Sequence, residues 1–136
     1  MARDGSFLLV LHGAKLPNVI PVLSADSPAA LSDADLNSTD LNSTDLSDTD
    51  LEGADLSHTN LSKANLTGAY LTRANLSSAN LNDADLTGAR LLGVDLRDGN
   101  LTDANLTGAN LTGAKVAKQQ VDSALTDSST RIPQFR

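Results

Sequence analysis

Leucine occupies every fifth position of the chain, without interruption, from Leu31 to Leu111, and Val116 and Val121 continue the register. In an α-helix, leucines five residues apart would rotate by about 140° at each step and spread around the whole circumference. In a flat strand, an odd spacing would send successive leucines to opposite faces. All the leucines can point one way only if the chain turns after each five residues. The pattern therefore predicts short extended segments that form the four sides of a coil.

The two residues before each leucine differ in character. Two positions before it the residue is small, most often alanine, and the residue directly before it is Asp or Asn in fourteen of the seventeen leucine-centred units. Residues two apart on an extended segment point to the same side, so the small residue and the leucine point inward together. The Asp or Asn between them, as at Asp35 and Asn65, must then point outward. The sequence predicts an apolar interior and a polar exterior.

The two residues after each leucine are typical of turns. The first is mostly Ser, Thr or Asn, although Leu92 stands there once, and a single exposed leucine needs no special explanation. The second is often Asp, Ser or Gly, and glycine is favoured at the third residue of a type II turn because φ is positive there. Each pentapeptide is therefore interpreted as a short side followed by a corner.

Units such as Ala-Asn-Leu-Thr-Gly at 64–68 and Ala-Asn-Leu-Ser-Ser at 74–78 closely resemble the pentapeptide-repeat family. The resemblance covers roughly residues 29 to 121. It implies an all-β solenoid, a right-handed quadrilateral β-helix with four pentapeptides in each coil and about four to five coils, of the quasi-linear kind that repeat proteins form. The handedness comes from the resemblance alone.

With twenty residues in each coil, residues twenty apart are expected to stack in columns, and leucines fill the inner ones. A fully buried leucine contributes about 1.5 to 3 kcal/mol, so these columns should dominate stability. The chain has only two Phe, one Tyr and no Trp, which suits a thin coil packed by leucine and alanine. The predicted structural core includes Leu36, Leu56, Leu76, Leu96, Leu51, Leu71 and Leu91.

A solenoid exposes unpaired edges at its ends, so both flanks are expected to act as caps. Residues 1–28 contain the apolar run 7–11 and three prolines, and predict a strand and loop over the first coil. The β-helix is expected at 29–121, and a C-terminal cap and tail at 122–136. Near that boundary Ala117, Val121, Ala124 and Leu125 have helical spacing, which predicts one short helix.

Charge and composition exclude several classes of protein. The net charge is -7, which disfavours binding to nucleic acid or to an anionic membrane. There is no cysteine, and no apolar run approaches the roughly 20 residues of a membrane span. The apolar run 7–11 is short for a signal peptide and no convincing cleavage site follows it. We expect a cytoplasmic protein, with the periplasm or the thylakoid lumen as alternatives.

Catalytic chemistry has little support in this sequence. The two histidines are His12, in the expected N-terminal cap, and His58, at a corner of the repeat. A catalytic site needs groups of different character brought together, and the glycines follow the five-residue register rather than a phosphate-binding pattern. We expect no catalytic residues, no bound cofactor and no resident metal.

Carboxylates are concentrated at one end of the repeat. The interval from Asp33 to Asp55 holds eight acids and no Lys or Arg, whereas residues 56–82 hold no acid. The simplest interpretation is a soluble end that discourages end-to-end pairing. The alternatives are a dock for a basic partner or a weak site for a divalent cation. The candidate interaction surface consists of Asp35, Asp40, Asp45, Asp50 and Asp55.

These observations favour a non-enzymatic scaffold that binds another protein, with a monomer expected and a weak dimer as the alternative. The resemblance also implies a second class, because some family members inhibit a type II topoisomerase as acidic mimics of DNA. This chain departs from that pattern, since every repeat centre is aliphatic, the tail is short and the acids gather at one end. The DNA mimic therefore remains the alternative function.

Overall fold

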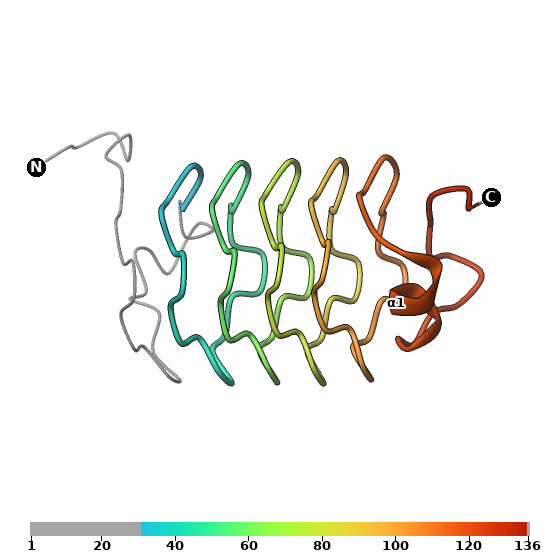
Figure 1. Ribbon diagram of the computed structural model, residues 1–136, viewed down its shortest axis with the longest axis horizontal. Coiled ribbons are helices and arrows are strands. Elements are labelled where there is room, and N and C mark those ends of the chain that lie inside the picture. Colours follow the sequence, from blue (N-terminus) through green and yellow to red (C-terminus); the bar gives the residue numbers. More distant parts are fainter. Residues whose placement is uncertain (1–30, 136) are drawn as a thin grey trace, which may run out of the picture.

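Residues 31–135 are described by a computed structural model, and within them the chain winds into a stack of similar coils (Figure 1). Parallel bridges join residues twenty positions apart, such as Asp35 with Asp55 and Asn60 with Asn80. Each extended segment is so short that it contributes one bridge residue, and the described residues contain no longer strand. The predicted stacking of residues twenty apart is confirmed. The cap predicted at residues 1–28 lies outside the described residues.

The bridges define four sides, which we number in chain order. Side 1 carries Asp35, Asp55, Asn75, Asp95 and Lys115, and side 2 carries Asp40, Asn60, Asn80 and Asn100. Side 3 carries Asp45, Asn65, Asp85, Asn105 and Leu125, and side 4 carries Asp50, Tyr70, Arg90, Asn110 and Arg131. The square cross-section that the five-residue period predicts is therefore present.

Hydrogen bonds between coils use almost every backbone group. Leu36 N–H donates to the carbonyl oxygen of Asp55 (2.8 Å), and Asp55 N–H donates back to that of Ala34 (2.9 Å). Ser38 N–H donates across the corner to the next coil, and Thr39 N–H closes the turn onto Leu36 O (3.2 Å). Only the N–H directly after each leucine has no backbone partner in this pattern.

The corners all have left-handed backbone geometry. Every fifth residue from Asp33 to Gly113 has a positive φ, between 55° and 72°, and eleven of these residues are not glycine. Type II turns require a positive φ at their third residue, so the predicted corner chemistry is confirmed. Bulky residues such as Lys63 (φ 60°) and Arg73 (φ 60°) adopt this conformation against their intrinsic preference. The stacked coils on either side of a corner must therefore hold its conformation.

The interior is a continuous column of leucine and alanine. All seventeen leucines at the repeat centres, from Leu31 to Leu111, are buried, among them every leucine predicted for the structural core. Thr39, Thr44, Thr49 and Thr59 take the small inward position in the first two coils and are buried too. Thr59 Oγ1 donates to the carbonyl oxygen of Leu36 (3.0 Å), which satisfies its hydroxyl inside the apolar column.

One helix interrupts the coil near the C-terminal end. Helix α1 spans Lys118–Asp122 and buries Val121 (Figure 1). The helix is shorter than the predicted spacing implied, because Ala117 is its N-cap, Ala124 follows its end, and Leu125 pairs with Asn105 on side 3 and is 57% exposed. Leu125 N–H donates to Ala104 O (2.8 Å), so the chain returns to the side it would have reached in a regular coil.

Candidate functional site

The candidate acidic residues lie on all four sides of the molecule. Asp35, Asp40, Asp45 and Asp50 belong to sides 1 to 4 in turn, and Asp55 follows Asp35 on side 1. The carboxylates are therefore distributed around the first described coil and do not converge on one point. A partner that used this whole ring would have to enclose the end of the solenoid, whereas a partner on one side would meet one or two of its members.

Each of these carboxylates already has a structural role. Asp35 Oδ1 accepts a hydrogen bond from Asn37 N–H (3.1 Å), and Asp40 Oδ1 accepts one from Asn42 N–H (3.1 Å). Asp45, Asp50 and Asp55 accept the N–H two residues ahead in the same way. These are the N–H groups that the coil leaves without a backbone partner. One oxygen of each carboxylate is thus committed to its own corner.

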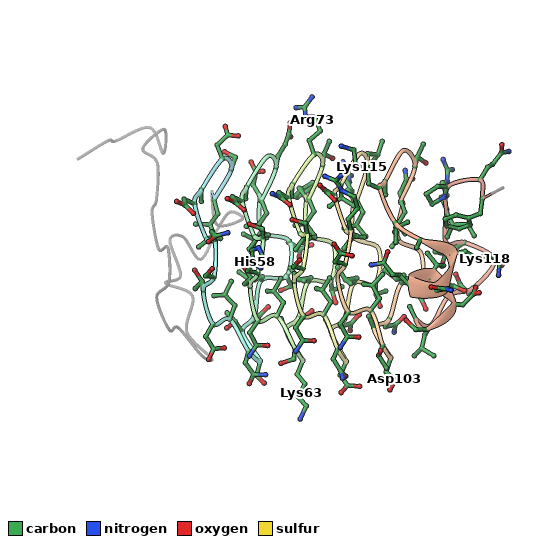
Figure 2. All side chains as sticks on the ribbon, in the orientation of Figure 1. His58, Lys63, Arg73, Asp103, Lys115 and Lys118 are labelled. Atoms are coloured by element: carbon green, nitrogen blue, oxygen red, sulfur yellow. The ribbon has the colours of Figure 1, made fainter. Side chains whose placement is uncertain are left out.

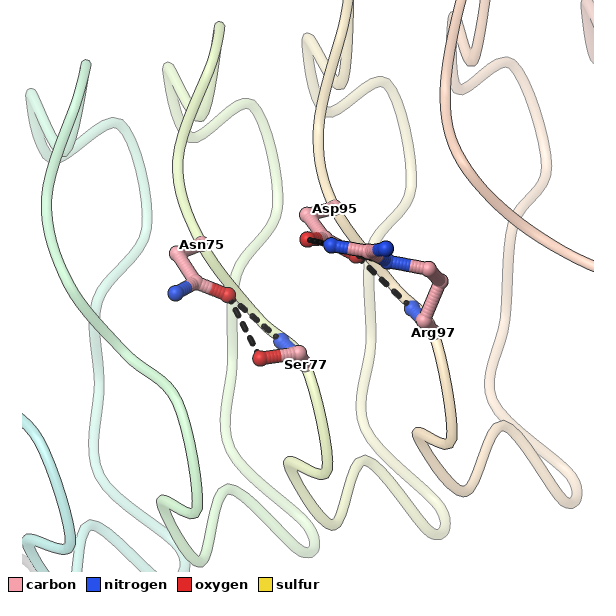
Figure 3. A network of polar contacts seen from close by, with 4 residues as sticks. All are labelled: Asn75, Ser77, Asp95 and Arg97. Carbon is pink, nitrogen blue, oxygen red and sulfur yellow. Dashed lines mark hydrogen bonds and ion pairs between the residues drawn. The ribbon is translucent and has the colours of Figure 1, made fainter.

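The same bond is made wherever Asp or Asn precedes leucine among the described residues. Figure 3 shows it in consecutive coils of side 1, where Asn75 Oδ1 accepts from Ser77 N–H (3.0 Å) and Asp95 Oδ1 accepts from Arg97 N–H (3.1 Å). Such side-chain bonds to the backbone two residues on are typical of Asp and Asn in turns. The Asp or Asn side chain is therefore a corner cap, which the sequence pattern had indicated only as an exterior residue.

Hydrogen bonds to these caps also shift their proton affinity. The Ser47 hydroxyl donates to Asp45 Oδ1 (2.7 Å), and this bond, with that of the Ser47 N–H, lowers the pKa of Asp45. Arg97 donates to both oxygens of Asp95, Nε at 2.9 Å and Nη2 at 2.6 Å, and lowers the pKa of Asp95. Both carboxylates are therefore stabilised in their ionised form.

The described residues do not gather catalytic or metal-binding groups. No three His, Asp or Glu side chains between residues 31 and 135 are placed to hold one metal ion. His58 lies at an exposed corner with φ 59° (Figure 2). In the described part of the chain, no helix has the length and apolar character needed to cross a membrane.

Sequence reasoning gave no weight to Tyr70 and Arg90, which replace the Asp or Asn cap in two consecutive coils of side 4. The signal was present in the sequence, because these two are the non-Asx residues among the leucine-centred units from Leu36 onward, and they stand twenty positions apart. Tyr70 and Arg90 are notable because they cannot make the capping bond that Asp and Asn make. The structure reveals that bond, because it shows which backbone groups already have partners in neighbouring coils.

The family described as pentapeptide repeats matches the chain at residues 29–68, 54–93, 64–103 and 89–117. No curated protein matches the chain significantly. HetL, a pentapeptide repeat protein of the cyanobacterium Nostoc sp. strain PCC 7120 involved in regulating heterocyst differentiation, is similar in structure, with a TM-score of 0.63 and 38% identity. The match covers 78% of this chain and 40% of HetL, so the chain spans less than half of that protein.

Two further solved structures are similar over most of their length. Rfr23, a pentapeptide repeat protein of the cyanobacterium Cyanothece 51142, has a TM-score of 0.59 and 33% identity, and the match covers 91% of this chain and 88% of Rfr23. A pentapeptide repeat protein of the Arabidopsis thaliana thylakoid lumen has a TM-score of 0.64 and 21% identity, over 90% of this chain and 82% of that protein. These similarities imply the right-handed quadrilateral β-helix.

Proposed function

The chain belongs to the pentapeptide-repeat family, and from this membership we propose that it is a non-enzymatic scaffold whose sides bind another protein. One observation supports the proposal above the others: the interior of the described coils is filled by small and aliphatic side chains, so these coils present their polar chemistry on the outer surface of their four sides. Repeat proteins use such extended surfaces for binding. The proposal does not name a particular partner protein.

We further propose that the repeat region forms about four to five coils and that the segment after Val116 closes their C-terminal end, since open solenoid ends need protection. Two side chains support the closure. Gln120 Nε2 donates to the carbonyl oxygens of Leu96 (2.6 Å) and Gly99 (2.9 Å). Thr130 Oγ1 donates to that of Leu106 (2.8 Å). Each supplies a donor to the last coil where another coil would otherwise follow.

The ring of Asp35, Asp40, Asp45 and Asp50, the acidic ring, is tested by affinity capture from the source organism with a bait in which these four charges are neutralised. Asn caps corners throughout this chain, so changing Asp35, Asp40, Asp45 and Asp50 to Asn removes four charges and keeps the fold. The matched control removes four charges from later coils, by changing Asp83, Asp85, Asp98 and Asp103 to Asn. A partner that is recovered by the wild type and the control, but not by the ring variant, supports the ring as the dock. Equal recovery from all three baits would dismiss it.

No structural observation favours the alternative of a DNA-mimicking topoisomerase inhibitor. Mimicry needs regularly spaced negative charge along one face, because duplex DNA carries one charge per about 1.7 Å of its axis. Among the described bridge residues, no side has more than two successive carboxylates, those being Asp35 and Asp55 on side 1. A supercoiling assay with purified protein would reveal inhibition at micromolar concentration if the alternative were correct.

A further inference from the structure

Side 4 lacks two corner caps in consecutive coils. Tyr70 and Arg90 stand where other units have Asp or Asn, and neither supplies an oxygen to the N–H two residues ahead. Thr72 N–H and Leu92 N–H therefore have no hydrogen-bond partner among residues 31–135. These two groups occupy equivalent positions in adjacent coils, about 4.8 Å apart at the usual strand spacing.

No other corner after a described bridge residue shows this deficit. From Asn37 to Thr112, every other N–H directly after a leucine is capped by the Asp or Asn two residues before it. Lys115 also lacks a capping oxygen, but there Gln120 Oε1 accepts from Ala117 N–H (2.7 Å). Thr72 and Leu92 are therefore two stacked backbone donors at a position that is otherwise satisfied from Asn37 to Thr112.

The side chains around these donors offer a positive charge for an anion and apolar surface for the aliphatic part of the same ligand. The Arg90 guanidinium lies over the Tyr70 ring, 4.8 Å from its centroid, and it forms no ion pair within the described chain. The Leu92 side chain is 36% exposed beside them. Arg73 projects from the bordering corner (Figure 2) and pairs with Glu52 at 2.7 Å, so Arg90 is the free cation of this group.

Charge and access also distinguish side 4 from the other three sides. Its bridge residues include one carboxylate, Asp50, and two guanidinium groups, Arg90 and Arg131, whereas the described bridge residues of sides 1 to 3 have a net negative charge. All six left-handed glycines lie at the two corners that border side 4. They are Gly53, Gly68, Gly88, Gly93, Gly108 and Gly113, so among the corner residues from 33 to 113 only Asp33, Asp48 and Arg73 place a side chain at these two edges.

We propose that Thr72 N–H, Leu92 N–H, Tyr70 and Arg90 form a carboxylate-binding notch for an acidic peptide segment of a partner protein. Carboxylate oxygens of the partner take the positions that Asp and Asn oxygens occupy at the other corners, and Arg90 supplies the compensating charge. A second copy of this chain is a poorer occupant, because five of the eight carboxylates between residues 33 and 55 already cap their own corners and Glu52 pairs with Arg73. The inference rests on the proposed scaffold function and gives the partner a chemistry.

The test follows backbone amide resonances of the full chain by NMR during titration with end-blocked hexaglutamate. Saturable shifts that are largest at Thr72 and Leu92 N–H are expected, and end-blocked hexaglutamine should produce none. Without peptide, these two amides should exchange with solvent much faster than the other amides directly after a leucine. Shifts spread evenly over Lys63, Lys115 and Arg97 would overturn the notch.

The decisive variant restores the repeat pattern. Changing Tyr70 and Arg90 together to Asn installs both missing caps, so the melting temperature should be kept or raised while hexaglutamate affinity falls at least tenfold. Arg131→Asn is the matched control, because it removes the same charge from side 4 away from the two donors, and it should bind within about twofold of the wild type. Equal affinity of the double variant and the wild type would refute the proposal.

Two further results separate this inference from its alternatives. Tyr70→Asn alone should abolish the peptide-induced shift at Thr72 and keep the one at Leu92, because each donor has its own cap. Concentration-dependent dimerisation that shifts the same two amides without peptide would make a second copy the occupant and overturn the proposal. Because capture of a partner by the acidic ring does not involve Tyr70 or Arg90, failure of the notch would leave that experiment unaffected.

Discussion

At the scale of single residues, the exterior position before each leucine is defined by one oxygen atom rather than by charge. Asp and Asn alternate freely along the sides because either supplies the acceptor for the N–H two residues ahead, as at Asn75 and Asp95. An uncapped N–H costs stability, and caps of this kind at helix ends contribute about 0.5 to 2 kcal/mol. The number of acids on the surface can therefore vary without loss of the fold.

The inner leucine is the residue with the least freedom. Leu76 is completely buried at the middle of the stack, with coils above and below it. Leu76→Asp would place an unpaired carboxylate in the apolar column, which costs more than a domain of this size can tolerate. We expect cooperative unfolding to disappear in thermal or denaturant melts followed by far-ultraviolet circular dichroism.

The matched control for this substitution is Leu92→Asp, since Leu92 is a leucine outside the column and is already 36% exposed. Its carboxylate would be solvated, so the melting curve should stay cooperative with a midpoint close to that of the wild type. An unchanged melt for Leu76→Asp would be incompatible with the buried leucine column.

At the scale of elements, helix α1 replaces one side of a coil and has to provide the hydrogen bonds of that side. Gln120 does this with a single amide, which donates to Leu96 O and Gly99 O and accepts from Ala117 N–H. The last bond is half of a capping box and fixes the start of the helix. The transition from coil to helix thus depends on one side chain that both donates and accepts.

Gln120→Glu keeps the shape and the acceptor of this side chain but removes its two donors. The carboxylate would face two carbonyl oxygens, so we expect a loss of about 1 to 3 kcal/mol in the free energy of unfolding. Faster hydrogen exchange should appear at Leu125 and Arg131, which continue the ladder behind the helix. Both effects can be measured by denaturant melts and amide exchange.

The control is Gln119→Glu, because Gln119 lies in the same helix, is exposed and donates no side-chain bond that the structure describes. It introduces the same charge at the neighbouring position. If both variants lost the same stability, the effect would come from charge near α1 rather than from the Gln120 bonds.

At the scale of the whole molecule, charge is distributed unevenly along and around the solenoid. Residues 33–55 contain eight of the seventeen acids, whereas the described bridge residues of side 4 have a net positive charge. Such an arrangement presents different potentials to partners that approach from different directions. The two surfaces proposed for binding, the acidic coil and side 4, therefore differ in the sign of their charge.

Stability should fall on acidification, partly through the capping carboxylates. The folded state lowers the pKa of Asp45, so the stabilisation from its ionised form is complete above the ordinary aspartate pKa of about 3.9 and is lost as the pH falls through the lower folded value. Asp45→Asn removes this pH-dependent stabilisation and keeps the capping hydrogen bond. We expect similar melting temperatures near pH 7 and a shallower decline for the variant below about pH 4.

The effect at Asp45 should stay under about 1 kcal/mol because the side chain is exposed and solvent screens it. Asn65→Asp, on the same side and one coil later, is the reverse substitution and should steepen the acid decline, because Thr67 N–H already donates to the side-chain oxygen at this position (3.0 Å). If the melting temperatures of the wild type and both variants fell equally steeply below about pH 4, these caps would not contribute to the pH dependence of stability.

Patterns that repeat within five residues were readable from the sequence, because each unit has to turn its own leucine inward. Leu76, the corner at Gly88 and the outward Asp35 all lie where the period predicted. Contacts between coils and at the end of the stack were decided only by the tertiary structure. The helical spacing around Val121 suggested that Leu125 belonged to α1, yet pairing with Asn105 outweighs a local preference in so short a segment. Likewise, Thr72 and Leu92 can be recognised as unpaired donors only in the tertiary structure, where neighbouring coils pair the other backbone N–H groups and Asp or Asn side chains cap the equivalent N–H groups from Asn37 to Thr112.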